Sequence, residues 1–147
     1  MTDWNALYDV ALRIAIKAHE GQLDKSGHAY IMHPVRVAER CKDVKAKIVA
    51  LLHDTIEDTD VTPDFLRSQG FPDEIIDGVL SVTKQDGESY EAFVRRAAQH
   101  PLGKAVKLAD LEDNMDIRRL KQISDEDVKR LQKYLRAWQY LYRHLNG

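Results

Sequence analysis

The stretch from Ala50 to Thr59 changes from wholly apolar to strongly polar within a few positions. The run that leads into it, residues 48–52, has no polar face, so it predicts a helix that is buried on all sides. An unpartnered imidazole and carboxylate at the end of a buried helix would be costly, so His53 and Asp54 need a compensating partner. Adjacent helical residues point about 100° apart, which lets both side chains reach one metal ion beyond the helix end. A satisfied, hydrogen-bonded helix end is the alternative for this dipeptide alone.

Two further acids follow the dipeptide at helical spacing. Glu57 lies four residues after His53, and Asp58 lies four residues after Asp54. If the helix continues for one more turn, each acid stacks beside a candidate metal ligand. The stretch would then combine a metal-binding pair with a carboxylate pair.

Hydrophobic periodicity predicts an all-α chain. From Trp4 to His19, apolar residues recur at helical spacing behind a cap at Thr2 or Asp3. Pro34 suits the first turn of a helix and should push His33 into an extended conformation before it. Further helices are predicted over residues 34–40, 45–54, 62–70, 72–82, 88–99, 101–115 and from 124 onward. A chain of 147 residues fits one domain, so we expect a bundle of about seven or eight helices.

The last predicted helix carries an apolar seam with steps of three and four residues. Its members are Val128, Leu131, Leu135, Trp138, Tyr142 and Leu145. We favour core packing against the first helices as the explanation, because too few heptads are present for a confident coiled coil. The alternative is an interface between two copies in a homodimer.

Charge and cysteine content exclude several classes of protein. The 22 Lys and Arg residues nearly balance 24 Asp and Glu residues, and no block of like charge suggests a partner nucleic acid or an anionic membrane. The single cysteine, Cys41, excludes an internal disulfide and is expected to be a buried structural thiol. No apolar run is long enough to span a membrane, and no leader peptide is evident. We therefore expect a cytoplasmic protein with a small-molecule partner.

An acid also lies within the apolar stretch of residues 106–111. On its own, Asp110 is explained by a surface salt bridge with Lys104 or Lys107. Together with His33, His53 and Asp54, however, it completes a set of two imidazoles and two carboxylates. Such a set suits Mn, Fe or Zn better than a metal that prefers thiolates.

The order of these residues resembles the H…HD…D pattern of HD-domain phosphohydrolases. The surrounding segments resemble the hydrolase domain of RelA/SpoT alarmone enzymes, and the resemblance spans residues 18 to about 115. The matching segments are residues 18–22, 25–27, 30–34, 50–59, 82–84 and 107–110. The resemblance implies that residues 1–147 form a single HD-domain helical bundle, similar to a stand-alone small alarmone hydrolase.

The resemblance also implies a role for each matched residue. One Mn²⁺ would be held by His33, His53, Asp54 and Asp110. The catalytic acids would be Glu57 and Asp58. Contacts with the nucleotide would come from Lys25, Ser26, Tyr30, Lys107 and Asn114. The implied reaction removes the 3′-pyrophosphate of (p)ppGpp and yields GDP or GTP with pyrophosphate.

The chain departs from the family pattern where the nucleotide would be recognised. Asp24 replaces the arginine of the usual Arg-Lys pair, and Leu111 and Asp113 replace the arginine and histidine of the usual LADRLHN. Two alternatives therefore stay open: the same site acting on ppApp-type adenine alarmones or on the 2′-phosphate of NADPH, and a metal-stabilised module that binds an alarmone without cleaving it. The presence of both Glu57 and Asp58 argues against a non-cleaving module.

Overall fold

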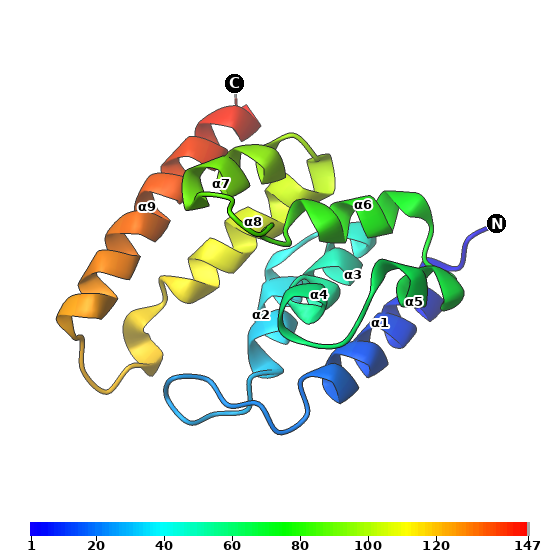
Figure 1. Cartoon of the computed structure of the whole chain (residues 1–147), viewed down its shortest axis with the longest axis horizontal. Helices are drawn as coiled ribbons and strands as arrows, with labels where there is room; N and C mark the ends of the chain where they lie inside the picture. The colour runs from blue at the N-terminus through cyan, green and yellow to red at the C-terminus, as the bar shows by residue number, and fades with distance from the viewer. Residues whose placement is uncertain (147) are drawn as a thin grey trace.

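The computed structural model describes the backbone of residues 1–146 and the side chains of residues 1–143 (Figure 1). Its elements are α1 (Trp4–Ala18), α2 (Met32–Arg40), α3 (Val44–Leu52), α4 (Thr55–Asp58), α5 (Pro63–Ser68), α6 (Asp73–Ser81), α7 (Tyr90–Ala98), α8 (Pro101–Asn114), the 3-10 turn η1 (Ile117–Arg119) and α9 (Asp125–Asn146). The described residues contain no β-strand beyond one isolated bridge between Leu23 and Ala29. The all-α prediction is confirmed, and eight of the α-helices are longer than the single turn of α4.

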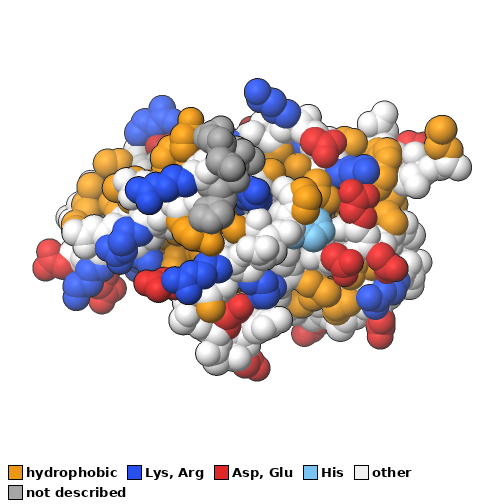
Figure 2. All heavy atoms as spheres, turned by 90° about the horizontal axis from the view of Figure 1, so that it is seen from above, with side chains coloured by type: hydrophobic (Ala, Val, Ile, Leu, Met, Phe, Trp, Pro, Cys, Tyr) orange, Lys and Arg blue, Asp and Glu red, His pale blue; other side chains and the backbone are white. Residues whose placement is uncertain are grey.

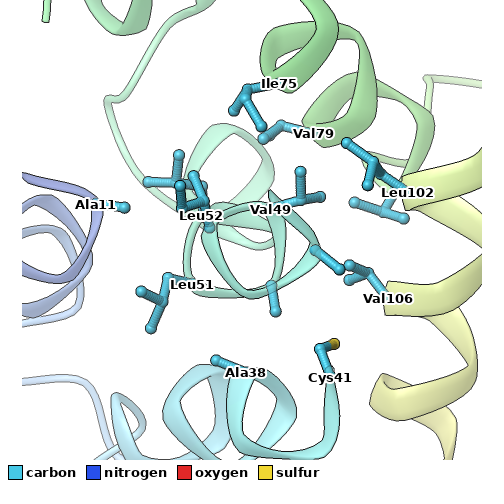
Figure 3. Packing of buried hydrophobic residues seen from close by; sticks show 14 of the residues in the cluster. Ala11, Ala38, Cys41, Val49, Leu51, Leu52, Ile75, Val79, Leu102 and Val106 are labelled. Atoms are coloured by element: carbon cyan, nitrogen blue, oxygen red, sulfur yellow. The ribbon is translucent and has the colours of Figure 1, made fainter. Parts of the chain in front are cut away.

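Helix α3 lies at the centre of the bundle, as its apolar sequence predicts. It packs against α1, α2, α6 and α8, and most of its residues are fully buried. Figure 3 shows Val49, Leu51 and Leu52 of α3 surrounded by apolar side chains of the neighbouring helices. Cys41 belongs to the same cluster and is buried, as expected for a structural thiol. The end of α3 is therefore held rigidly in the interior of the protein.

The prediction of an extended His33 is wrong. Helix α2 begins at Met32, so His33 lies in its first turn and precedes Pro34 within the helix. A proline is tolerated there because the first amides of a helix have no intrahelical acceptor. The backbone N–H of His33 donates to the carbonyl of Tyr30 (2.9 Å), and its ring is held by Asp113. These contacts outweigh the usual bias against helical geometry before proline.

The helix that carries His53 also ends earlier than expected. Helix α3 stops at Leu52, and His53 and Asp54 form a turn before the short helix α4 begins. The hydroxyl of Thr55 donates to the carbonyl of Leu52 (2.8 Å), which satisfies a group that the interrupted helix leaves free. Glu57 therefore lies on a separate helical turn and not on a continuation of α3.

Helix α9 runs along α8 and α7 and closes one side of the bundle (Figure 1). Its buried residues are Ala137 and Leu141, which pack into a second apolar cluster with residues of α7 and α8. The prediction that the seam packs in the core against the first helices is wrong, because α9 packs on α7 and α8 and three seam members are exposed: Val128, Leu135 and Tyr142. The side chain of Leu145 lies outside the described residues. The alternative, a seam between two copies, stays a prediction.

On the face shown in Figure 2, basic side chains are more frequent toward α9 and acidic ones toward the opposite end, while apolar side chains are scattered over the whole face. Within the part of the chain that is described, no helix combines the length and the apolar character needed to cross a membrane.

Candidate active site

Four side chains converge where the C-terminal end of α3 and the start of α4 meet α8 and the start of α2. His33 Nε2 lies 2.9 Å from Asp110 Oδ1, and His53 Nε2 lies 3.1 Å from Asp54 Oδ2 and 3.4 Å from Asp110 Oδ1. One donor atom from each of His33, His53 and Asp54 lies within 4.8 Å of the other two. The fold thus brings together the four predicted ligands, which are up to 77 positions apart in the chain.

The histidine rings are oriented with their Nε2 atoms toward this centre. His53 Nδ1 lies 2.6 Å from the carbonyl of Ala50, which can only accept, so the ring carries a proton on Nδ1. His33 Nδ1 lies 2.7 Å from Asp113 Oδ2. His53 Nε2 is buried and has no hydrogen-bond partner among the described residues. Two oriented imidazoles, two carboxylates and an orphaned ring nitrogen fit a divalent metal ion.

The electrostatics of the site also favour a bound cation. Burial alone would lower the pKa of His53, but the negative charges of Asp54 and Asp110 raise it well above the usual value. Burial alone would raise the pKa of Asp110, but Lys107 and the two histidines lower it well below the usual value. The carboxylates are therefore charged at neutral pH and attract a positive partner, which a proton or a metal ion can provide.

A cavity of about 450 Å³ opens over the convergent side chains. Four of the predicted substrate-binding residues line it: Lys25, Ser26, Tyr30 and Asn114. The hydroxyl of Tyr30 donates to Asp54, and Asn114 Nδ2 donates to Asp110 Oδ1 (3.1 Å). The cavity is within the size range of small-molecule sites in proteins.

Glu57 and Asp58 border the same cavity. Glu57 Oε1 accepts a hydrogen bond from the backbone N–H of Lys84 (2.8 Å), so its carboxylate is held in place. The pKa of Asp58 is raised by partial burial and by the neighbouring charges of Asp54 and Glu57. The break between α3 and α4 therefore still leaves both acids beside the candidate metal ligands.

No family model matches the chain. The chain is 36% identical over 118 residues to the probable GTP pyrophosphokinase of Mycobacterium leprae, and this alignment covers 71% of this chain and 15% of that protein. It is 37% identical over 116 residues to the guanosine-3′,5′-bis(diphosphate) 3′-pyrophosphohydrolase of Vibrio cholerae, over 69% of this chain and 16% of that protein. It is 35% identical over 120 residues to the bifunctional (p)ppGpp synthase/hydrolase SpoT of Escherichia coli, over 71% of this chain and 17% of that protein.

The chain is therefore similar in sequence to proteins of the RelA/SpoT type. It spans about one sixth of the length of the curated relatives it matches. A solved structure described as a metazoan ortholog of SpoT that hydrolyses ppGpp aligns over 100% of this chain and 89% of that one, with a TM-score of 0.76 and 24% identity. That likeness shows that the all-α RelA/SpoT fold extends over the whole chain.

The RelA/SpoT resemblance placed Lys107 among the substrate-binding residues, but the structure places it behind the metal site. Lys107 is buried, and its Nζ lies 3.0 Å from Asp110 Oδ2. The ammonium also lies over the rings of Phe93 and Tyr90, at 4.7 and 5.5 Å from their centroids. It does not line the cavity. Its contacts suit a residue that holds Asp110 in position.

Asp24, which departs from the RelA/SpoT pattern, is used by its own loop. Its Oδ1 accepts hydrogen bonds from the backbone N–H groups of Ser26 and His28, each at 2.9 Å. This arrangement shapes the loop that carries Lys25 into the cavity. The acid is therefore explained by loop structure and needs no contact with a nucleotide base.

Sequence reasoning missed several residues that line the cavity. Arg36 comes from α2, Arg119 from η1, and Arg130 and Tyr134 from α9. Three of these residues lie beyond position 115, where the recognisable RelA/SpoT segments end. Helical spacing on α9 was the only available signal, since Arg130 and Tyr134 are four residues apart and share a face.

Proposed function

We propose that this chain is a metal-dependent hydrolase of the RelA/SpoT type that removes the 3′-pyrophosphate of (p)ppGpp and yields GDP or GTP with pyrophosphate. The observation that carries the proposal is the convergence of His33, His53, Asp54 and Asp110 beneath a nucleotide-sized cavity, with two more carboxylates beside them. The names of relatives that match over about 70% of this chain support the substrate. We propose Mn²⁺ as the ion because the site offers imidazole and carboxylate ligands and no thiolate.

A divalent ion held by the four candidate ligands would act as a Lewis acid and make a bound water more acidic. Glu57, fixed by the amide of Lys84, is placed to orient the attacking water. Asp58, with its raised pKa, is suited to accept the proton of that water. The water oxygen bonds to the phosphorus attached to the 3′ oxygen, the 3′ O–P bond breaks, and a proton passes to the 3′ oxygen.

Cations around the cavity would offset the charge of the phosphates. Lys25 approaches from the loop after α1, while Arg119 and Arg130 approach from the C-terminal elements. The pKa of Lys25 is lowered by partial burial and by the nearby charge of Arg130. An anion bound between these two cations would relieve their repulsion, which supports a phosphate site at this end of the cavity.

The proposal is tested by turnover assays of the purified protein with Mn²⁺, comparing ppGpp, ppApp and NADPH with the products separated by chromatography. We expect pyrophosphate and GDP to be the fastest products. Faster release of ADP from ppApp would move the substrate to adenine alarmones, and orthophosphate with NADH would move it to NADPH. Recovery of unchanged ppGpp bound to the Mn²⁺-loaded protein would support a binding module and contradict hydrolysis.

Two substitutions separate metal binding from activation of the attacking water. We expect Asp54→Ala to abolish both Mn²⁺ binding and turnover, because it removes a ligand. Glu57→Gln should retain Mn²⁺ and lose about 10²- to 10⁴-fold in kcat, because it removes the charged carboxylate that orients the attacking water. Calorimetric titration with Mn²⁺ and steady-state kinetics measure the two effects. Metal retention by the first variant, or a near-normal rate for the second, would contradict the assigned roles.

A further inference from the structure

Arg96 of α7 closes the loop that joins α6 to α7. Its guanidinium donates to both carboxylate oxygens of Glu88 (2.8 and 2.9 Å), to the carbonyl of Leu80 (2.9 Å) and to the carbonyl of Thr83 (2.7 Å). Leu80 and Thr83 lie where the loop begins, and Glu88 lies where it ends. One side chain therefore ties together both ends of a connection that has no regular structure of its own.

The loop is also fixed from within. Glu88 Oε1 accepts a hydrogen bond from the backbone N–H of Gln85 (3.0 Å), and the hydroxyl of Thr83 donates to the carbonyl of Val79 (2.8 Å). The pairing with Arg96 lowers the pKa of Glu88 to about 2, so the carboxylate is charged at neutral pH. A bidentate pair of this kind sets direction as well as distance, because the guanidinium is planar and its donors are fixed.

Lys84 lies between these anchored points, and its backbone N–H donates to Glu57 Oε1 (2.8 Å). Arg96 itself does not line the cavity, and its hydrogen bonds go to Glu88, Leu80 and Thr83 and not to Glu57. The contacts instead form a chain from the guanidinium to the loop backbone, from the loop to the amide of Lys84, and from that amide to the carboxylate. If the loop shifts, the orientation of Glu57 shifts with it.

We propose that Arg96 is a positioning residue that aims the carboxylate of Glu57 by holding the residue 83–88 loop in one conformation. This inference rests on the proposed hydrolytic role of Glu57 for its effect on rate, but the structural link between Arg96 and the Lys84 amide does not depend on that role. Misplacement of a catalytic group by about 1 Å can cost about 10²-fold in rate. Arg96→Gln should therefore lower kcat by about 10- to 100-fold, with KM and Mn²⁺ affinity changed less than about threefold.

The test is a double-mutant cycle between Arg96→Gln and Glu57→Gln. If Arg96 acts through Glu57, its substitution has less than about a twofold effect in the Glu57→Gln protein, because there is no catalytic carboxylate left to misplace. An equal loss of rate in both backgrounds would overturn the inference. The neighbouring Arg95 is the matched control, since it lies on the same helix and is exposed with only a weak pair to Glu91 at 3.8 Å. Arg95→Gln should leave kcat unchanged.

Hydrogen exchange of the Lys84 amide gives a readout that does not require turnover. We expect this amide to exchange at least about tenfold faster in Arg96→Gln than in the wild type or in Arg95→Gln, because the loop that presents it to Glu57 is released. Arg96→Lys keeps the positive charge but lacks the planar donors, so it should also accelerate exchange. This variant provides the test if Arg96→Gln fails to fold. Unchanged protection in a folded Arg96 variant would overturn the inference. Faster exchange in a protein that hydrolyses no alarmone would uphold the link and refute the proposed function.

Discussion

Asp113 shows how one buried side chain can serve several parts of the site. Its Oδ2 lies 2.7 Å from His33 Nδ1, and Arg36 Nε donates to its Oδ1 at 3.0 Å. Arg119, which lines the cavity, donates to its backbone carbonyl at 2.8 Å. This carboxylate stands where the family pattern has a histidine, and in this chain Asp113 orients a candidate metal ligand while it anchors two cations.

We predict that Asp113→Asn weakens Mn²⁺ binding by about 10- to 100-fold, the usual effect of removing the partner of a metal-binding histidine. The neutral amide is a poorer acceptor for the Nδ1–H of His33 and no longer balances the charges of the half-buried Arg36 and Arg119. Calorimetric titration with Mn²⁺ measures the change. Glu112→Gln is the control, because Glu112 is adjacent on α8 but exposed and bonded to Trp138. Equal Mn²⁺ affinities for the two variants would contradict the role of Asp113.

At the residue scale, the convergence of the four candidate ligands could be predicted because their chemistry is unusual for their surroundings. A histidine and acids next to fully apolar helix segments demand a partner, whatever the details of packing. The direction in which a residue points could not be predicted in the same way. Lys107 precedes a ligand by three residues, and only packing against Phe93 and Tyr90 shows that it faces inward. Asp24 likewise has a role that only the path of its loop reveals.

At the scale of elements, the predicted helices match the structure within a few residues because their periodicity, caps and prolines agree. The exceptions are the places where tertiary contacts compete with local signals. His33 is helical despite the following proline, and α3 is interrupted after Leu52. On α9, the seam pattern pointed to a face that is partly exposed, since Ala137 and Leu141 make the buried contact with the second apolar cluster. A small residue such as alanine carries little weight in a hydrophobic pattern, but it permits close approach of a helix.

Helix α9 brings Arg130 into the cavity, so we predict that Arg130→Gln raises KM for the nucleotide by about tenfold. This factor corresponds to the binding free energy that one charged hydrogen bond contributes. The value of kcat should change by less than about threefold, because Arg130 lines the cavity in an ion pair with Asp127 and not with a candidate metal ligand. Steady-state kinetics separates the two parameters. Arg136→Gln provides the comparison, since Arg136 lies on the same helix but borders a different hollow. A loss confined to kcat would place Arg130 at the chemistry instead.

At the scale of the whole molecule, the candidate metal site lies where several helices meet around α3. The ligands come from α2, from the turn after α3 and from α8, so the charge in the site is coupled to the packing of the bundle. The order of these segments in the chain indicated that they would meet, but the C-terminal contribution to the cavity could not be predicted. Residues 116–134 have no recognisable motif, and their place over the site depends on how α9 docks on α7 and α8.

This coupling predicts a distinctive dependence of stability on pH for protein treated with a chelator. The pKa values of His33 and His53 are raised in the folded protein, so each contributes stability that is present below their unfolded value of about 6.5 and is lost as pH rises through the folded value. The pKa values of Asp54 and Asp110 are lowered, so they contribute stability above about pH 4 that is lost as pH falls. Chelated protein should therefore be most stable between about pH 4 and 6.5.

Added Mn²⁺ should oppose the loss of stability above about pH 6.5, because metal binding requires neutral histidines and takes the place of the bound protons. We predict that the difference in Tm between Mn²⁺-saturated and EDTA-treated protein increases from pH 6 to pH 8, in thermal melts recorded at fixed ionic strength. His53→Gln should remove most of this increase, since it removes both the titrating group and a ligand. A Tm for EDTA-treated wild type that rises steadily from pH 6 to pH 8 would contradict the prediction. It would mean that, without a bound metal, the folded protein is more stable with neutral histidines than with protonated ones.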